Sequence, residues 1–492
     1  MDGRWILLCM SVIAGCDGCE STPPQPLAPT PDLRIVAVTD LQGTLEPCGC
    51  TSNSLGGIDR LVQAVENARG DVPTVFVAAG DLLAGGPSHG GPEAEAQERW
   101  RAETMAAVLD DAELRAAVGG PSDEALSLEA LDAGLYGSGE SLTLDVGPKV
   151  ALLAVRELAD LETLETRARA ARSDGAELVI ALTNLPRRAQ RGVAIEGVDF
   201  VVQGGLDSER ALPPTEASPA WLLHAGRQGQ GVLVLDLFLD GRSGAFVDVS
   251  EWSLEVARSS LVASIQELEA RLEGWRAEGR TEDELASQAG RLRAMQAELE
   301  ALAPPELPAG ARGFSAHLIA LDRQQPRNGE VAERLGALDR RINDFNETTY
   351  ADRRPPEPEE GQAHYVGSDA CASCHSAAHA WWLGHAHGRA YATLQGLNKE
   401  FHLECVGCHV TGYERPGGST VTQLLDGALR NVGCENCHGA GSAHIESPLE
   451  ASLPAETPES VCVSCHNEQH SDLFNYEVYV RTLRVRGHGL PE

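Results

Sequence analysis

The pattern Cys-x-x-Cys-His occurs four times between residues 371 and 466 of this 492-residue chain. Two thiols at this spacing can bond covalently to the two vinyl groups of one haem, and the adjacent histidine can then bind the iron. Zinc held by paired cysteines is the alternative, but zinc does not require a histidine directly after every pair. The pattern therefore predicts four c-type haems. Their attachment cysteines would be Cys371, Cys374, Cys405, Cys408, Cys434, Cys437, Cys462 and Cys465, and their proximal ligands would be His375, His409, His438 and His466.

The second axial ligand of each iron can be narrowed by elimination. All four methionines of the chain precede residue 361, so methionine is excluded as a ligand in the C-terminal segment. The histidines of this segment outside the four motifs are His364, His379, His385, His387, His402, His444, His470 and His488. Eight histidines for four positions make two histidine ligands feasible at every haem, and we expect most of the haems to have them. Such haems have lower reduction potentials than haems with a methionine ligand.

The same segment resembles the tetrahaem cytochrome c family typified by the electron acceptor of hydroxylamine-oxidising bacteria. The matching stretches are Y-V-G-S-D-A-C-A-S-C-H, H-G-R-A-Y-A-T-L, E-C-V-G-C-H-V-T-G-Y and N-V-G-C-E-N-C-H-G-A-G-S-A-H. The resemblance implies that His387 and His444 are distal ligands, since they match the family's H-[AG]-x-A and G-x-G-S-x-H. We expect His470 and His488 to be the other distal ligands. His379 and His385 are either ligands or neighbours of the haem edges, and His402 is expected to be neither.

Between residues 32 and 250, short apolar runs alternate with amphipathic segments. The predicted strands are Arg34–Thr39, Thr74–Ala79, Val150–Val155, Leu178–Leu182, Phe200–Gln203, Trp221–His224 and Gly231–Leu239, and Leu158–Arg172 is typical of a helix. Continuous apolar strands indicate sheets covered on both faces, so we predict an α/β layered domain. Sites in this architecture form where loops leave the carboxyl ends of strands, and Asp40 and Asp81 follow directly after two of them.

Three strings, T-D-L-Q-G-T-L-E-P, G-G-I-D-R-L and A-A-G-D, resemble the calcineurin-like metallophosphoesterase domain of the 5′-nucleotidase family. Active members clamp two metal ions with a D-x-H, a G-D, a G-N-H-[DE], a histidine after a strand and a G-H-x-H. Asp40 and Asp81 match this pattern. The remaining ligand positions hold Gln42, Gly120-Pro121, Asn184, Leu206 and Ser208. Because a two-metal phosphatase needs the missing nitrogen ligands, we expect this domain to be inactive toward phosphoesters.

Two features near this predicted site leave alternatives open. Asp40 and Asp81 either cap the loops at the strand ends or form a vestigial site for a divalent metal. Cys48 and Cys50, in E-P-C-G-C, could form a disulfide, bind a soft metal or remain free thiols, and Cys19 is a further partner for either.

The first fifteen residues combine Arg4 with an apolar stretch that is too short to span a bilayer but is typical of a secretory signal. The sequence Ile13-Ala14-Gly15-Cys16 resembles a bacterial lipoprotein box, in which the cysteine is lipidated and becomes the new N-terminus. An ordinary signal peptide with a chance cysteine is the alternative. The proline-rich residues 16–31 predict a semi-rigid tether. We therefore expect an exported protein, anchored by lipid on the periplasmic side of a bacterial membrane.

Apolar residues, mostly leucines, spaced four and three residues apart between residues 261 and 302 predict an antiparallel helical hairpin, which could be a spacer or a dimerisation arm. A strand at Gly313–Leu321, a helix at Val331–Phe345 and an acidic, proline-rich linker at Pro355–Glu360 are expected to follow. The predicted organisation is a signal peptide (1–15), a tether (16–31), the α/β domain (32–250), the hairpin (251–304), a strand, helix and linker (305–360), and a mainly α and irregular tetrahaem domain (361–492).

The formal net charge of −34 argues against binding to nucleic acid. We expect an electron-transfer protein rather than an enzyme, whose partner is a redox protein or a quinol-linked electron donor or acceptor, with the N-terminal domain used for docking or sensing. One alternative is a multihaem oxidoreductase acting on a small nitrogen or sulfur compound. Others are a metal-dependent phosphoesterase or nucleotidase with an accessory cytochrome domain, and a binding protein with a structural haem domain.

Overall fold

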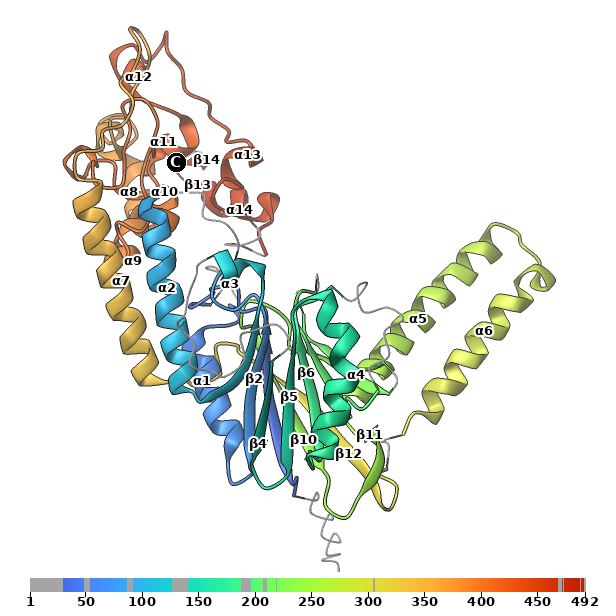
Figure 1. Ribbon diagram of the computed structural model, residues 1–492. Coiled ribbons are helices and arrows are strands. Elements are labelled where there is room, and N and C mark those ends of the chain that lie inside the picture. Colours follow the sequence, from blue (N-terminus) through green and yellow to red (C-terminus); the bar gives the residue numbers. More distant parts are fainter. Residues whose placement is uncertain are drawn as a thin grey trace, which may run out of the picture.

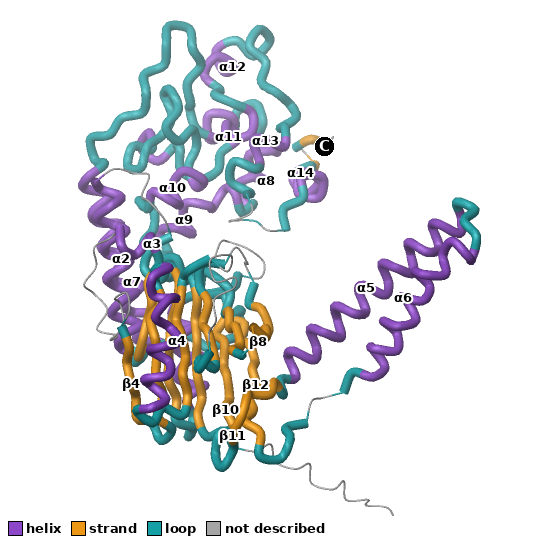
Figure 2. The backbone as a smooth tube through the Cα atoms, turned by 45° about the vertical axis from the view of Figure 1, so that its right-hand side comes forward, coloured by secondary structure: helices purple, strands orange, loops and turns teal. Residues whose placement is uncertain are grey.

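The computed structural model shows a layered α/β domain, a long helical hairpin that projects from it, and a loop-rich C-terminal segment (Figures 1 and 2). It describes residues 30–47, 54–85, 92–125, 140–186, 196–206, 210–217, 219–303, 306–467, 471, 473–486 and 488–490. The predicted signal peptide, the lipidation site Cys16, nearly all of the tether, and Cys48, Cys50, Ser208 and His470 lie outside these residues. No helix in the described part of the chain is long and apolar enough to cross a membrane.

The first sheet has six strands in the order β11-β12-β10-β1-β2-β3. These strands are β1 (Leu33–Thr39), β2 (Thr74–Gly80), β3 (Leu114–Gly119), β10 (Gly231–Phe238), β11 (Ser243–Asp248) and β12 (Ala311–Ala320). The strands β1, β2 and β3 run parallel to one another, so the residues that follow them meet at one edge of the sheet. The strand β10 is antiparallel to both β1 and β12.

The second sheet has the order β4-β5-β6-β7-β9-β8. Its strands are β4 (Ser141–Asp145), β5 (Lys149–Val155), β6 (Leu178–Thr183), β7 (Phe200–Gln203), β8 (Leu212–Ala217) and β9 (Ala220–His224). The four central strands are parallel, and β4 and β8 pair with them in the antiparallel sense. Ile35 and Val77 from the first sheet pack with Leu152 and Ile180 from the second in one buried core.

Helices cover the outer faces of both sheets. The first sheet is covered by α1 (Ile58–Arg69), α2 (Pro92–Asp111) and α7 (Gly329–Thr349), and the second by α4 (Leu158–Ser173). Both faces of the parallel strands are therefore buried, which explains why their sequences are continuously apolar rather than alternating. This four-layer arrangement confirms the predicted α/β layered domain.

The first domain extends beyond the predicted boundary at residue 250, because β12 pairs with β10 and β11, and α7 packs on α1 and α2. The hairpin of α5 (Glu251–Ala277) and α6 (Glu282–Ala301) is thus an insertion between two strands of one sheet. Its helices meet along a short seam of Leu268, Leu272 and Leu285. The Thr281 hydroxyl accepts a hydrogen bond from the Glu284 backbone N–H and caps α6.

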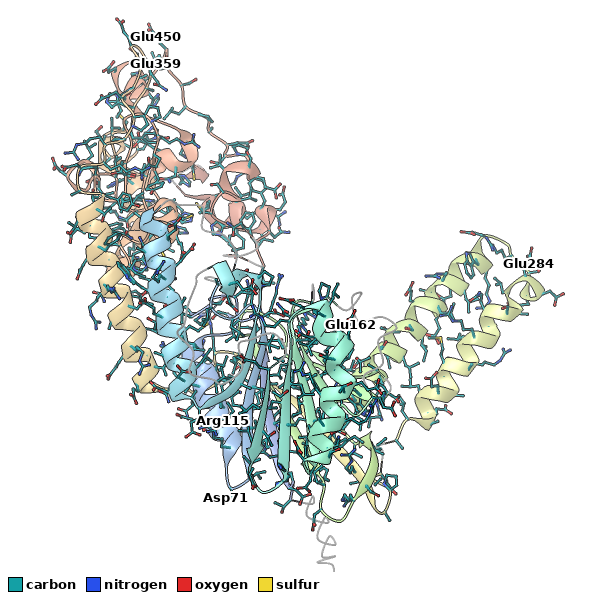
Figure 3. All side chains as sticks on the ribbon, viewed as in Figure 1. Asp71, Arg115, Glu162, Glu284, Glu359 and Glu450 are labelled. Atoms are coloured by element: carbon teal, nitrogen blue, oxygen red, sulfur yellow. The ribbon has the colours of Figure 1, made fainter. Side chains whose placement is uncertain are left out.

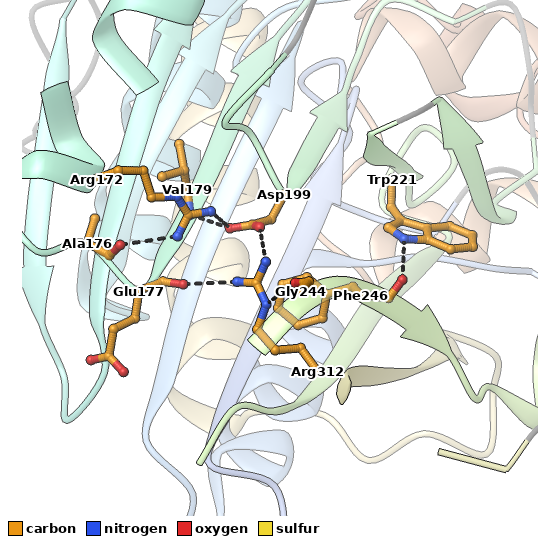
Figure 4. Close-up of polar contacts among 9 residues, drawn as sticks. All are labelled: Arg172, Ala176, Glu177, Val179, Asp199, Trp221, Gly244, Phe246 and Arg312. Carbon is orange, nitrogen blue, oxygen red and sulfur yellow. Dashed lines mark hydrogen bonds and ion pairs between the residues drawn. The ribbon is translucent and has the colours of Figure 1, made fainter. Parts of the chain in front are cut away.

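A buried carboxylate links the two sheets at the ends opposite the C-terminal segment (Figure 4). Asp199, just before β7, pairs with Arg172 and Arg312, and the guanidinium of Arg312 also donates to the Gly244 carbonyl at 2.7 Å. The Arg312 guanidinium carbon lies 4.3 Å from the centre of the Phe246 ring. Since Arg312 belongs to the first sheet and Asp199 to the second, this cluster fixes their relative position.

The C-terminal segment consists of short helices joined by long loops. They are the 3-10 turn Ser368–Cys371, α8 (Ser376–Gly384), α9 (Ala390–Gln395), α10 (Leu403–His409), α11 (Cys434–His438), α12 (Ser442–Glu446), α13 (Glu459–Cys462) and α14 (Tyr476–Leu483). Its apolar core contains only a few residues around Tyr391, Val406 and Val421. The segment sits at the ends of α2 and α7 (Figure 1).

The negative charge is spread over all three parts of the molecule. Acidic residues labelled in Figure 3 lie at the tip of the hairpin (Glu284), on the α/β domain (Asp71 and Glu162) and on the C-terminal segment (Glu359 and Glu450).

Candidate functional site

Each of the four Cys-x-x-Cys-His motifs lies in or next to a short helical turn. The His375 backbone N–H donates to the Cys371 carbonyl at 2.9 Å, and His466 bonds to Cys462 in the same way at 2.8 Å. Residues four apart on a helical turn share one face, so each turn presents its thiols and its imidazole together. The eight motif cysteines form no disulfide with one another. The motifs are therefore arranged as covalent haem attachment requires.

The four motifs lie in two neighbouring pairs, and in each pair a thiol of one motif contacts a thiol of the other. The Cys371 thiol hydrogen-bonds to Cys434, which lowers the pKa of Cys434 to about 6 and raises that of Cys371. In the same way, a hydrogen bond with Cys408 lowers the pKa of Cys465 to about 6. The first motif therefore lies beside the third, and the second beside the fourth.

Three pairs of histidine rings have the spacing expected for two ligands of one metal. The ring centroids are 6.4 Å apart for His375 and His444, 6.2 Å for His387 and His466, and 6.2 Å for His438 and His488. Imidazoles on opposite faces of one metal have centroids about 6 Å apart, because each metal–nitrogen bond is about 2.0 Å and each centroid lies about 1.1 Å further out. Each pair joins one proximal histidine to one predicted distal histidine, so the residues fit haem iron.

Backbone carbonyls fix the orientation of four of the motif histidines and predicted distal histidines. The Nδ1 atoms of His409, His438, His444 and His488 face the carbonyl oxygens of Ala390, Pro454, Ala451 and Leu483 at 2.6, 2.7, 2.8 and 2.6 Å. A ring nitrogen that faces a carbonyl oxygen carries the proton, which leaves Nε2 with a lone pair for a metal. A hydrogen bond of this kind on the second ring nitrogen is the usual arrangement of metal-bound histidines.

Among the predicted distal ligands, His387 also has a pKa that is shifted by burial. The pKa of His387 is lowered to about 4, mainly by burial and then by the neighbouring His385. His387 is therefore neutral at physiological pH and has a lone pair to offer.

Three further histidines of the segment each use a ring nitrogen in another contact. The Nε2 atom of His402 lies 3.1 Å from the Asp339 carbonyl oxygen, and that of His379 lies 3.0 Å from Asp369 Oδ1. His385 accepts a hydrogen bond from the His387 backbone N–H through Nδ1. Among the described residues, no ring pair of the metal-ligand spacing includes His409, and the predicted ligand His470 lies outside them.

Residues 370–439 match the family model described as cytochrome c554 and c-prime. Cytochrome c-554 of Nitrosomonas europaea is 35% identical over 94 residues, which are 16% of this chain and 40% of that protein. The chain therefore spans less than half the length of this relative. These matches confirm the predicted resemblance of the C-terminal segment to a family of cytochromes c with covalently bound haem.

Several solved structures resemble the chain at low sequence identity. A 5′-nucleotidase precursor from Thermus thermophilus is 14% identical, with a TM-score of 0.39, over 69% of this chain and 62% of that one. A calcineurin-like phosphoesterase from Bacillus subtilis is 13% identical, with a TM-score of 0.37, over 64% of this chain and 99% of that one.

At the carboxyl edge of the first sheet, Asp40 and Asp81 are engaged by backbone N–H groups. Both carboxylate oxygens of Asp40 accept from Gly205 at 3.0 Å, and Asp81 Oδ1 accepts from Ser122 at 2.9 Å. Burial raises the pKa of Asp40. A Cβ atom on Gly120 would lie 2.0 Å from Asp81 Oδ1, so the backbone itself fills the space beside this carboxylate.

Asp123 is a central residue of this edge that the sequence motifs did not identify. Its carboxylate accepts hydrogen bonds from the backbone N–H groups of Leu82, Leu83, Ala84 and Gly120, and burial raises its pKa to about 6. Within the described ranges, no group of three or more His, Cys, Asp or Glu side chains could hold a metal ion. These residues do not fit the two-metal centre of a phosphoesterase, because the carboxylates that remain already bind the chain's own backbone.

The segment before the second motif joins the C-terminal segment to the α/β domain. Lys399 is only 8% exposed and pairs with Glu46, from the loop after β1, and with Asp339 of α7 at 3.4 Å. The backbone of Phe401 donates to Asn343 and accepts from Asn346, both at 2.9 Å. The second motif begins at Cys405, so it is the motif held most directly by the α/β domain.

Proposed function

We propose that the chain is an exported tetrahaem c-type cytochrome that transfers electrons, with the phosphoesterase-like domain as the platform that carries the haems. The observation that supports this most strongly is the spacing of the three histidine pairs. Each pair combines residues far apart in sequence, and each contains one member of a Cys-x-x-Cys-His motif. Packing of side chains that only filled a core would not favour this regularity.

The pairs support a proposed set of axial ligands for three haems. The first haem would be held by His375 and His444, the third by His438 and His488, and the fourth by His466 and His387. Haem iron with two histidine ligands supplies one-electron transfer at low potential. Backbone carbonyls orient the imidazoles, and the attachment cysteines of the first and third motifs, and of the second and fourth, lie close together.

A haem count tests this proposal. The full chain would be expressed with a cytochrome c maturation system, and its covalent haem measured by reduced-minus-oxidised spectroscopy and by mass. We expect four haems per chain, and three in a Cys434→Ser, Cys437→Ser double variant. Fewer than four in the unaltered chain would contradict the proposal.

Export and anchoring are a separate part of the proposal, and they rest on the sequence around Cys16. We expect labelled palmitate to be incorporated into the unaltered protein and to be lost in Cys16→Ser. A redox protein or a quinol-linked donor or acceptor would then exchange electrons with the haems on the periplasmic side of the membrane. Unlabelled wild-type protein would rule out the lipid anchor and leave the haem proposal untouched.

One observation favours a second candidate, a multihaem oxidoreductase acting on a small nitrogen or sulfur compound. His409 belongs to no ring pair among the described residues, and His470 is the remaining predicted ligand. Carbon monoxide added to the reduced protein distinguishes the two functions. No spectral change, together with a new change in His470→Ala, would indicate that His470 closes the second haem. A change in the unaltered protein would favour the oxidoreductase.

A phosphoesterase is the candidate that the site supports least, since the edge of the first sheet does not fit two metals. Metal-dependent hydrolysis of a phosphoester that Asp40→Ala and Asp81→Ala abolish would restore it.

A further inference from the structure

Trp381 lies face to face with a predicted haem ligand far away in sequence. Its ring is stacked on His488, with centroids 5.0 Å apart and planes 12° apart. The same ring lies 4.8 Å from His385, which follows α8 directly and is four residues after Trp381. Trp381 is neither part of an attachment motif nor a ligand type for iron, so the haem proposal gives it no role.

The ligand that Trp381 contacts has an unusual orientation within its pair. The ring planes of His438 and His488 are 79° apart, whereas those of His375 and His444 are 27° apart. The Nδ1–H group of His488 donates to the Leu483 carbonyl at 2.6 Å, which anchors one edge of the ring. The indole of Trp381 covers a face of the ring, so the imidazole cannot turn toward the plane of His438 without striking it.

We propose that Trp381 is a positioning residue that holds His488 perpendicular to His438 across the third haem. The inference rests on the proposed function, because it needs these two histidines to be ligands of one iron. Neighbouring groups commonly fix the ring orientation of metal-bound histidines. The angle between two axial imidazole planes sets the splitting of the iron d orbitals, so perpendicular and near-parallel pairs give different electron paramagnetic resonance signals in ferric low-spin haem.

A second stacked pair offers a matched control on another haem. Phe474 lies 5.0 Å from His466 with planes only 10° apart, and His466 forms its pair with His387 at 50°. Removing the Phe474 ring should therefore alter a different signal from the one that Trp381 controls.

The experiment compares the oxidised, fully haem-loaded chain with Trp381→Ala, Trp381→Leu, Trp381→Phe and Phe474→Leu. In the unaltered protein we expect one low-spin signal of the perpendicular type. This signal should be lost or shifted toward the near-parallel type in Trp381→Ala and Trp381→Leu, and retained in Trp381→Phe, which keeps an aromatic face. In Phe474→Leu it should remain while another signal shifts.

Covalent haem is counted in every variant. This count separates a wrong ligand assignment from a wrong role for Trp381. Four haems without a bis-histidine low-spin signal in the unaltered protein would refute the ligand assignment on which the inference depends. Normal signals that stay unchanged in both Trp381→Ala and Trp381→Leu would refute the role of Trp381 alone. Leucine keeps an apolar side chain at this position. If Trp381→Ala loses a haem, the signal of Trp381→Leu therefore decides whether Trp381 positions His488.

Discussion

Replacing Lys399 by methionine should loosen the cytochrome segment from the α/β domain. The Lys399 ammonium is buried between Glu46 and Asp339, and methionine keeps the apolar stem while removing the charge. Burial alone would lower the pKa of Lys399, but the two carboxylates outweigh it and the pKa is raised. Removing one partner of a buried ion pair costs about 3–5 kcal/mol.

The loss of stability in Lys399→Met should be smaller than about 3–5 kcal/mol. The Glu46 side chain is 45% exposed, so water screens its part of the interaction. The Asp339 side chain is only 16% exposed, and its pKa is raised to about 6, mainly by burial and then by Glu46. Asp339 can therefore take up a proton when Lys399 is absent. We expect a loss of about 1–3 kcal/mol in the free energy of unfolding at pH 8.

The sign of the pH dependence follows from Asp339. The pKa of Asp339 in the folded protein is above its ordinary value of 3.8. The group therefore contributes most to stability at pH values below 3.8, and this contribution is lost as the pH rises through about 6. Without Lys399 the charged carboxylate is more costly. The difference between Lys399→Met and the unaltered protein should therefore be larger at pH 8 than at pH 5.

The chain contains only one other lysine, Lys149, which provides the control variant Lys149→Met. Its amino group bonds to the Asp174 carbonyl at an exposed site. Denaturant unfolding followed by haem absorbance would give the loss of stability. Amine acylation followed by mass spectrometry should modify Lys149 quickly and Lys399 slowly. Equal stability of the two variants, or equal acylation of the two lysines, would refute the buried ion pair.

Three further predictions concern the α/β domain. Burial raises the pKa of Asp123 to about 6, so stability should fall by about 2 kcal/mol as the pH rises from about 4 to 7, and denaturant unfolding of Asp123→Asn should lack this part of the pH dependence. Gly120→Ala should lower the free energy of unfolding by about 1–3 kcal/mol, because the new Cβ would lie 2.0 Å from Asp81 Oδ1; an unchanged melting temperature would contradict this. Asp199→Asn removes the charge shared by Arg172 and Arg312 and should cost about 2–3 kcal/mol, measured by the same unfolding assay; a loss no larger than for an exposed ion pair would show that the cluster is dispensable.

Local patterns in the sequence predicted most of the individual strands but not how they associate. The strand predicted at Phe200–Gln203 matches β7, because a continuous buried run is visible within a few residues. The boundary at residue 250 was wrong, because the pairing of β12 with β10 joins residues separated by a long hairpin. No local period records a contact of that kind.

The haem sites divide in the same way. The spacing of thiols and proximal histidines within a motif is local, so the sequence alone predicts it. Which predicted distal histidine lies near which motif histidine depends on the path of the chain between short helices, as in the pair of His375 and His444. Asp123 went unpredicted because a single aspartate carries no pattern, and its importance comes from four backbone N–H groups on two separate loops.

The position of β12 also determines the order in which the protein can be completed during synthesis. Since β12 lies between β10 and β11, the first sheet cannot close until residues 311–320 have emerged, and α7 follows immediately. A chain that has reached Thr349 already contains every strand of both sheets, and also Asn343 and Asn346, which later bind the backbone of Phe401. All four attachment motifs are made after that point. The scaffold can therefore be complete before the segment that contains the motifs folds, so that segment can fold against an existing surface.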